Sequence, residues 1–269
     1  MTTHFAERYG PWAVVAGASE GTGREFARAI AAQGVSCVLI ARREGPLTAL
    51  AAQIRSESGV ECVTAAVDLS AVDACERIVA AVGAREVGLY VSNAGADSHG
   101  ARFLDKDART WMDLSQRNVM TTLQCCHHFA MPMRARRRGG LLLVNSGACY
   151  GGSSFLATYA ASKAFVLCFA EGLWAELQPC GIDVLTLVLG KTDTPAHRAL
   201  LIEKGMPIPA DMASPIEVAR VGLAQLPQGP IYNWGQPNDV AGYAPSSPDA
   251  RRARIRLIDQ HTRSTFGGG

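Results

Sequence analysis

The stretch "WAVVAGASEGTGREFARAIAAQG", residues 12–34, decides the predicted fold. It begins with an apolar, β-branched run that predicts a buried strand and ends with an amphipathic pattern that predicts a helix. Between them stand Gly17, Ser19, Gly21, Thr22 and Gly23. Glycines in such a turn let the backbone approach a diphosphate, and the N-terminus of the next helix offers it N–H groups. The alternative is that the glycines serve only the tight turn itself.

Beyond this unit, the same alternation of apolar strand and amphipathic helix runs through most of the chain. The strand candidates are residues 12–17, 36–41, 61–68, 88–93, 141–146, 183–189 and 230–234. The helix candidates cover residues 24–33, 45–58, 71–84, 108–135, 155–178 and 214–226. Apolar strands joined by helices indicate a parallel sheet that is covered on both faces. The predicted fold class is α/β, a doubly wound, Rossmann-like three-layer sandwich of about seven strands.

Two segments depart from this alternation. Residues 191–214 form a long connection with three prolines, and connections of this length are typically lids or binding loops. Residues 235–269 predict an irregular tail that is rich first in Pro, Gly and Ser and then in Arg. No repeat or long linker divides the rest, so residues 1–269 are predicted to form a single dinucleotide-binding domain.

The composition excludes several classes of function. Apolar residues make up 48% of the chain and charged residues 19%, enough for a compact core. The formal net charge of +2 provides no field for nucleic acid, and no stretch approaches the about 20 apolar residues of a membrane span. The basic run "RARRRGG", residues 134–140, is interpreted as the complement of a helix C-terminus. The first residues lack the apolar segment of a signal peptide, so we expect a cytoplasmic protein.

The cysteines and histidines do not indicate a metal site. None of the eight cysteines belongs to a C-x-x-C pair, and most of them stand in apolar runs. The run Cys125-Cys126-His127-His128 invites a metal interpretation, but neighbours in a helix point in different directions. We therefore predict reduced, buried cysteines and no bound metal.

The end of the second strand indicates which dinucleotide is bound. A carboxylate at this point would accept hydrogen bonds from the adenosine ribose and favour NAD. Arg42 and Arg43 stand there instead, and guanidinium groups match a 2′-phosphate in charge and shape. NADP(H) is therefore predicted in preference to NAD(H). The alternative is that both arginines merely solvate a loop.

Two further strand ends agree with a dinucleotide. "VDLS" places Asp68 and Leu69 at the end of the third strand, where the carboxylate could accept from the adenine amino group. "SNAG" ends the fourth strand with Asn93, Ala94 and Gly95, whose small size lets a ligand lie close to the sheet edge. Each signal is weak alone, since these residues are also ordinary turn formers. Together they fall at the carboxyl ends of successive strands, where such sheets bind ligands.

The fifth strand ends at Ser146, and "YAASK" then places Tyr159 and Lys163 one helical turn apart. The pair could simply pack, or it could be a phenol whose acidity is tuned by an ammonium group. Reducing a ketone requires a hydride on carbon and a proton on oxygen. A phenol with its ordinary pKa near 10 suits this task at neutral pH only when nearby positive charge favours the phenolate.

These motifs together resemble the short-chain dehydrogenase/reductase family, in its single-domain branch. The matching motifs are "GASEGTG", "VDLS", "SNAG", the asparagine of "SQRNVM", the serine of "VNSGA", and "YAASK", and they span residues 12 to 194. The resemblance implies a triad of Ser146, Tyr159 and Lys163 with Asn118 as a fourth member. It implies that Tyr159 is the general acid or base and that Ser146 binds the substrate oxygen. It also implies that Lys163 holds the nicotinamide ribose, and that Asn118 interrupts its helix and binds a proton-relaying water.

The sequence departs from the family pattern after the sixth strand. The family commonly has Pro-Gly followed by a threonine, whereas this chain reads "LGKTDTP", with Leu189 in place of the proline. Gly190 and Thr194 remain, so they are predicted to contact the cofactor. Thr192 is a second candidate to bind the nicotinamide carboxamide, and the sequence leaves the choice between Thr192 and Thr194 open.

The segments predicted to wall the substrate pocket are apolar. They are residues 95–104, 147–156 and 191–214, with His99 and His197 as polar candidates. The apolar candidates are Phe103, Tyr150, Phe155, Leu200, Leu201, Ile202, Met206 and Met212. An apolar, adaptable wall suits a steroid, an acyl chain or an aromatic ketone.

The predicted function is an NADPH-dependent oxidoreductase that interconverts a ketone and a secondary alcohol on a small apolar substrate. The motifs are closer to hydroxysteroid dehydrogenases and 3-ketoacyl reductases than to sugar enzymes, by fold-level analogy. A homodimer or homotetramer is expected from the family and from the apolar faces of residues 108–135 and 155–178. The alternatives are a non-catalytic dinucleotide-binding sensor or scaffold, and an epimerase or dehydratase of the same superfamily.

Overall fold

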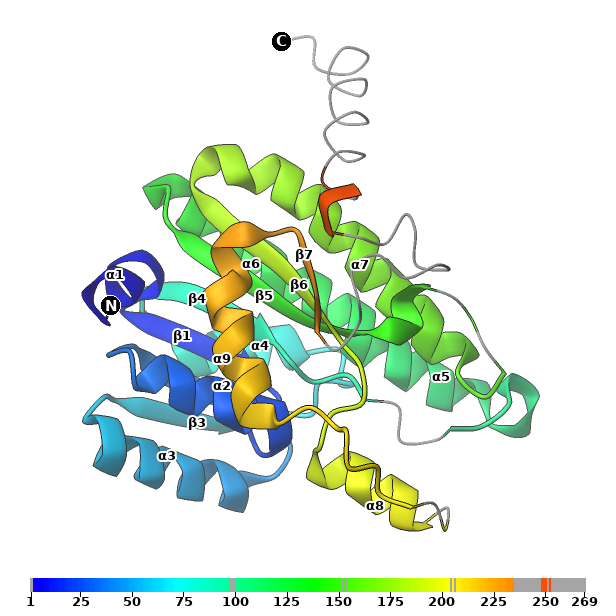
Figure 1. Cartoon of the computed structure of the whole chain (residues 1–269). Helices are drawn as coiled ribbons and strands as arrows, with labels where there is room; N and C mark the ends of the chain where they lie inside the picture. Colours follow the sequence, from blue (N-terminus) through cyan, green and yellow to red (C-terminus); the bar gives the residue numbers. More distant parts are fainter. Residues whose placement is uncertain are drawn as a thin grey trace, which may run out of the picture.

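The strands of the described residues lie side by side in one seven-stranded parallel sheet, in the order β3-β2-β1-β4-β5-β6-β7 (Figure 1). They are β1 Trp12–Ala16, β2 Ser36–Ala41, β3 Cys62–Ala66, β4 Val87–Ser92, β5 Gly139–Ser146, β6 Ile182–Leu189 and β7 Ile231–Trp234. The computed structural model describes residues 2–96, 100–150, 152, 154–203, 205, 207–234, 248–250 and 252. Each predicted strand is present, and the predicted fold class is confirmed.

Helices cover both faces of the sheet. One face carries α2 Gly21–Ala31, α3 Glu44–Ser58 and α9 Pro215–Gln225, and the other carries α4 Ala74–Val82, α6 Thr121–Arg136 and α7 Ala157–Leu177. Because successive strand side chains point to opposite faces, the neighbours Val14 and Val15 enter different cores, where both are fully buried. Among the described residues, no helix combines the length and the unbroken apolar character needed to cross a bilayer.

The single helix predicted over residues 108–135 is divided into three parts. α5 covers Ala108–Ser115, a π-helical turn η2 covers Gln116–Met120, and α6 follows without a loop. The expected interruption at Asn118 is therefore present. Such π-helical turns widen the helix by one residue and often occur at functional sites.

The segment 191–214 contains a helix that the sequence pattern did not predict. α8 covers Pro195–Glu203, with proline in the first position, where its missing N–H is not needed. The two ends of the segment are joined by backbone hydrogen bonds, from Asp193 N to Ala213 O at 3.0 Å and from Ala213 N to Lys191 O at 2.9 Å. The chain therefore departs shortly after β6 and returns to the same point before α9, and an isolated bridge outside the seven strands joins the two ends.

A second helix that the sequence did not predict, α1 Thr2–Tyr9, lies against the amino end of the sheet. Arg8 donates to both carboxylate oxygens of Asp183 on β6, at 2.5 and 2.7 Å, and the Tyr9 hydroxyl donates to Asp183 Oδ2 at 2.6 Å. A bidentate, partly buried ion pair of this kind fixes orientation as well as position. Short helical turns complete the described elements: η1 Phe103–Asp105, η3 Gly147–Tyr150, η4 Gln178–Cys180 and η5 Leu226–Gln228.

The basic run at residues 134–140 is used within the chain. α6 ends at Arg136, and Arg138 forms an ion pair with Glu86 at 2.6 Å. Arg137 donates to the Pro179 carbonyl at 2.9 Å. This agrees with the interpretation of the run as part of a helix end. Apart from residues 248–250 and 252, the predicted C-terminal tail lies outside the described residues.

Candidate active site

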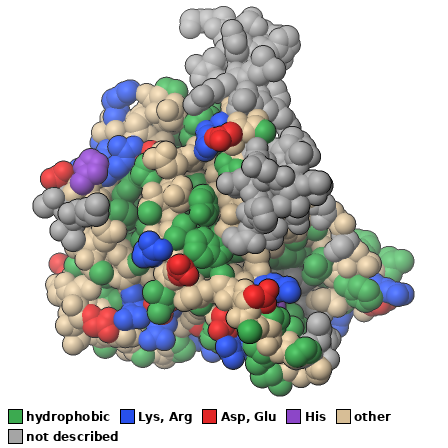
Figure 2. Space-filling view, in the orientation of Figure 1, with side chains coloured by type: hydrophobic (Ala, Val, Ile, Leu, Met, Phe, Trp, Pro, Cys, Tyr) green, Lys and Arg blue, Asp and Glu red, His purple; other side chains and the backbone are tan. Residues whose placement is uncertain are grey.

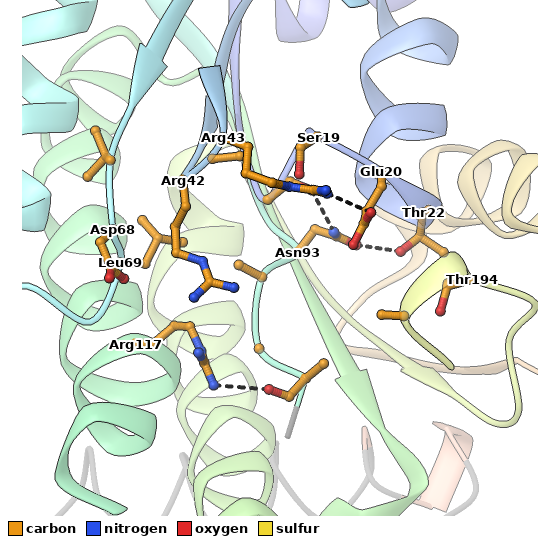
Figure 3. A pocket seen from close by; sticks show the side chains of 18 residues that line it. Ser19, Glu20, Thr22, Arg42, Arg43, Asp68, Leu69, Asn93, Arg117 and Thr194 are labelled. Carbon is orange, nitrogen blue, oxygen red and sulfur yellow. Dashed lines mark hydrogen bonds and ion pairs between the residues drawn. The ribbon is translucent and has the colours of Figure 1, made fainter. Parts of the chain in front are cut away.

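A cavity of about 330 Å³, the strand-end cavity, opens at the carboxyl ends of β1 to β4 (Figure 3). It lies where the strand order reverses, with β2 on one side of β1 and β4 on the other. Ligands of open α/β sheets bind at this point. Predicted cofactor residues that line it are Gly17, Ser19, Gly21, Thr22, Arg42, Arg43, Asp68, Leu69, Asn93, Ala94, Gly95 and Thr194. Gly23, Gly190 and Thr192 are not among its described lining residues.

The glycine turn is shaped by close backbone contacts. Gly17 has a φ of +87°, and a Cβ there would lie 2.7 Å from Ala94 N. A Cβ on Gly23 would lie 2.0 Å from the Gly17 carbonyl oxygen, so Gly23 supports the turn from beneath. Asn93 holds both sides of this turn, because it accepts from Thr22 Oγ1 at 2.7 Å and donates to Gly17 O at 3.2 Å. The surface left open is backbone, which suits the close approach of a diphosphate.

Charged side chains line the other side of the strand-end cavity. Arg42 and Arg117 both extend into it, whereas Arg43 forms an ion pair with Glu20 at 2.6 Å (Figure 3). Asp68 accepts from the backbone N–H and the hydroxyl of Ser70, at 3.0 and 2.7 Å. Burial raises the pKa of Asp68, but these hydrogen bonds, together with Arg42 and Arg117, outweigh it and lower the pKa. Asp68 therefore presents an anionic acceptor at neutral pH.

The proposed catalytic side chains come from β5 and α7. Ser146 is the last residue of β5, and its Oγ accepts from Ala148 N at 3.3 Å. Tyr159 and Lys163 stand one turn apart on α7, with Lys163 Nζ 5.7 Å from the centroid of the tyrosine ring. Lys163 is only 5% exposed, and its Nζ donates to the Val144 carbonyl at 3.1 Å. An ammonium group therefore lies buried below the phenol.

Asn118 occupies the centre of the π-helical turn η2 and is 3% exposed. Its Nδ2 donates to Ser162 Oγ at 3.0 Å and to Gly95 O at 3.4 Å. Ser162 in turn donates to the Tyr159 carbonyl at 2.7 Å. The widened turn thus lets one asparagine contact both α7 and the β4 strand end.

Gly95 joins the strand-end cavity to the proposed catalytic residues. It lines the cavity, and a Cβ on it would lie 3.0 Å from Lys163 Nζ and 3.2 Å from Asn118 Oδ1. Lys163 and Asn118 therefore lie directly behind Gly95, although neither of them lines the cavity.

Asn145, which the sequence did not single out, connects two of the proposed catalytic residues. Its side chain is 2% exposed, accepts from Ser146 N at 2.9 Å and donates to the Lys163 carbonyl at 3.1 Å. It also donates to Thr186 Oγ1 on β6 at 3.3 Å. One buried carboxamide thus fixes β5, α7 and β6 relative to one another.

Lys163 makes the stability of the cofactor-free protein depend on pH. Burial lowers the pKa of Lys163 from 10.5 to about 8; Cys149 opposes this effect and Arg117 adds to it. Between these two pKa values the unfolded chain binds more protons than the folded one, so the free energy of unfolding rises with pH. Relative to Lys163→Met, the wild-type protein is expected to gain up to about 3 kcal/mol between pH 8 and 10.5.

Urea unfolding of both proteins from pH 7 to 10.5 would measure this difference. Lys191→Met serves as the control because it removes the same positive charge from an exposed side chain. Parallel stability curves for wild type and Lys163→Met would contradict a depressed lysine pKa.

The two threonine candidates after β6 have different surroundings. Thr194 lines the strand-end cavity, and its Oγ1 accepts from His197 N at 3.2 Å (Figure 3). Thr192 is buried, and its Oγ1 donates to Gly190 O at 3.3 Å. The ring of His197 contacts the Thr192 carbonyl at 3.0 Å, so this histidine supports the start of α8. Of the two, Thr194 is the threonine that lines the cavity.

The predicted apolar wall is partly exposed. Phe103 is 55% exposed, Phe155 45% and Ile202 67%, and Figure 2 shows apolar side chains gathered over α8 and near α5. Leu201 is buried, and Cys149 packs with a core cluster of Leu167, Val188 and Ile231. His99 and Met206 lie outside the described residues. Within the described residues, His, Cys, Asp and Glu side chains form no group of three that could hold a metal ion.

Two charged residues of the strand-end cavity were missed by the sequence reasoning. Glu20 stands in the glycine turn, and Arg117 precedes Asn118 and donates to the Ala96 carbonyl at 3.0 Å. Glu20 could have been noticed as a carboxylate inside a predicted anion site. Arg117 could not, because only the π-helical turn directs it toward the cavity.

The comparison with known proteins agrees with this geometry. Residues 11–204 match the family model described as short chain dehydrogenase. This chain belongs to the short-chain dehydrogenase family. It is 35% identical over 193 residues to a 7beta-hydroxysteroid dehydrogenase of Collinsella aerofaciens, covering 72% of this chain and 73% of that protein. It is also 35% identical over 242 residues to a very-long-chain 3-oxoacyl-CoA reductase of Laccaria bicolor, covering 87% and 69%.

Solved structures give the same assignment. A 7beta-hydroxysteroid dehydrogenase structure is 28% identical, with a TM-score of 0.82 over 93% of this chain and 98% of that chain. A short-chain dehydrogenase from Sphingobium yanoikuyae in complex with NADPH is 25% identical, with a TM-score of 0.77 over 92% and 95%. The predicted enzyme class, an NAD(P)-dependent short-chain dehydrogenase, is confirmed, and the non-catalytic alternative is not favoured.

Proposed function

We propose that this short-chain dehydrogenase uses NADPH to interconvert a ketone and a secondary alcohol on an apolar substrate. The observation that carries the proposal is the buried Lys163 ammonium, 5.7 Å from the Tyr159 ring and close to Gly95 of the strand-end cavity. The tight turn of Gly17 and Gly23, where a Cβ would meet backbone atoms of the protein itself, brings the N-terminus of α2 to the cavity, which fits the diphosphate of a dinucleotide. These features join a cofactor site and a proton donor in one place.

The proposed mechanism divides the chemistry between cofactor and protein. Bound NADPH supplies the hydride for the carbonyl carbon. Tyr159 donates its phenolic proton to the carbonyl oxygen, while Ser146 Oγ donates a hydrogen bond to the same oxygen as negative charge develops. Lys163 stabilises the phenolate that remains, because an adjacent positive charge favours the ionised phenol. Asn118 holds a relay water beside Lys163, through which the proton is replaced from solvent.

Arg42 and Arg43 support the choice of NADPH over NADH. Both line the strand-end cavity at the end of β2, where the adenosine ribose of a dinucleotide would lie. Guanidinium groups bind phosphate oxygens through charge and paired N–H donors. Asp68 and Leu69 at the end of β3 are proposed to contact the adenine ring. Thr194 and Gly190 are proposed to contact the nicotinamide end.

A steroid, acyl or aromatic ketone is the proposed substrate class. The exposed apolar side chains Phe103, Phe155 and Ile202 belong to the segments that follow β4, β5 and β6, respectively. Relatives named as acting on 7beta-hydroxysteroids and on very-long-chain 3-oxoacyl-CoA agree with this class. A homodimer or homotetramer is proposed to bury the apolar groove of about 410 Å³ between α6 and α7, lined by Leu123, Ala130, Phe169 and Leu173.

A titration of the purified protein with NADPH and NADH, followed by nicotinamide fluorescence, tests the proposal first. We expect NADPH to bind at least about ten-fold more tightly, as two additional charge-assisted hydrogen bonds would provide. Hydrophobic ketones are then screened by NADPH oxidation at 340 nm as a function of chain length and ring number. A preference for NADH would contradict the proposed cofactor, and turnover confined to polar sugars would contradict the proposed substrate class.

A further inference from the structure

An ion pair forms part of the lining of the strand-end cavity. Glu20 is the residue that precedes α2, and Arg43 is the residue that precedes α3. The Arg43 guanidinium and the Glu20 carboxylate meet at 2.6 Å, and both residues line the cavity (Figure 3). The Glu20 carboxylate accepts no hydrogen bond from the N–H groups of α2 and pairs with Arg43 instead.

The pair engages one of the two arginines that face the proposed 2′-phosphate position. A carboxylate and a phosphate are both anionic acceptors that bind a guanidinium through paired N–H groups. When Arg43 is held by Glu20, only Arg42 remains directed into the cavity from the end of β2 (Figure 3). The Glu20 charge would also repel a phosphate that enters beside it.

We propose that Glu20 is a specificity-determining residue that competes with the 2′-phosphate for Arg43 and thereby limits the preference for NADPH over NADH. The proposal rests on the cofactor choice proposed above. It assigns a function to a residue that otherwise only places negative charge in an anion site. It also predicts that the relative affinity for NADPH and NADH depends on the charge of Glu20 and not on its size.

The exposure of the pair allows this competition. The side chains of Arg43 and Glu20 are 58% and 42% exposed, and exposed ion pairs are weak, equivalent to a few-fold change in a binding constant. A phosphate with two negative charges can therefore displace the carboxylate at a small cost. The expected influence of Glu20 is a tuning of selectivity and not a block of binding.

The test measures binding of 2′,5′-ADP and of 5′-ADP by calorimetry at constant ionic strength. Glu20→Gln keeps the size of the side chain and removes its charge. We expect it to bind 2′,5′-ADP about 3- to 10-fold more tightly than wild type, with 5′-ADP changed by less than about two-fold. The measured quantity is the ratio of the two affinities, which reports the 2′-phosphate alone.

Glu57→Gln is the matched control. Glu57 is 44% exposed and pairs with Arg28 at 3.3 Å, and it does not line the strand-end cavity, yet its replacement changes the net charge equally. A rise of the affinity ratio in Glu20→Gln but not in Glu57→Gln supports the inference. An equal ratio in wild type and both variants overturns it.

A double-mutant cycle with Arg43→Gln shows whether Glu20 affects the affinity ratio through Arg43. If Glu20 acts by competing for Arg43, most of the gain from Glu20→Gln should vanish in the Arg43→Gln background. An undiminished gain there overturns the competition. The proposed cofactor choice fails separately, if wild type and the variant lacking both Arg42 and Arg43 bind 2′,5′-ADP and 5′-ADP in the same ratio.

Discussion

Tyr159→Phe is expected to lower kcat by about 10³-fold or more while NADPH affinity stays within about two-fold of wild type. The substitution removes only the hydroxyl proton donor, and the ring above Lys163 remains in place. Single-turnover oxidation of bound NADPH at 340 nm measures the chemical step. Nicotinamide fluorescence measures cofactor binding in the same sample.

Tyr232→Phe is the control for this experiment. Tyr232 belongs to β7 and is partly buried, so its replacement loses the same hydroxyl from a position outside the proposed catalytic group. Its turnover should remain near that of wild type. Unchanged turnover in Tyr159→Phe would refute general acid catalysis by this phenol and would favour another proton donor.

Replacing Arg42 and Arg43 together by Ala is expected to weaken NADPH binding about 100-fold and NADH binding less than about three-fold. The loss reflects the charge-assisted hydrogen bonds that only the 2′-phosphate makes. Because Arg43 is already paired with Glu20, Arg42→Ala alone should account for the larger part of it. Fluorescence titrations of both nucleotides at two salt concentrations would measure these effects.

A control double variant loses two positive charges at other positions. It distinguishes direct contacts with the nucleotide from the effect of net charge on binding. Arg28→Ala combined with Arg109→Ala removes two ion-paired arginines, the first partly buried and the second exposed, that do not line the strand-end cavity. It should leave the ratio of NADPH to NADH affinity unchanged. Equal losses for both nucleotides in the Arg42/Arg43 variant would remove the argument for a 2′-phosphate contact.

The strand ends were predictable from the sequence because their residues follow directly from local pattern. Gly17, Arg42, Asp68 and Asn93 each come after an apolar strand, and parallel strands bring their carboxyl ends together by topology. Lys163 could be assigned to the same face as Tyr159 from helical spacing alone. Local periodicity and the direction of the strands were sufficient for these positions.

Other features depended on tertiary contacts that no local pattern encodes. α1 is stabilised by the contact of Arg8 with Asp183, 175 residues further along the chain. The pairing of Glu20 with Arg43 requires two turns to face each other across a cavity. The different surroundings of Thr192 and Thr194 depend on where the start of α8 turns each side chain.

Asn145 holds the proposed catalytic residues in place, whereas residues 193–212 are attached to the fold less extensively. Its hydrogen bonds hold Ser146 and Lys163 to β6, whereas residues 193–212 form an excursion after β6 whose two ends are joined by a pair of backbone hydrogen bonds. Exchange of this excursion by recombination or by directed evolution, with Thr194 and the buried Leu201 kept, is therefore expected to change which substrates fit without disturbing Ser146 and Lys163. New substrate ranges are expected to arise here by replacement of one segment while the sheet stays unchanged.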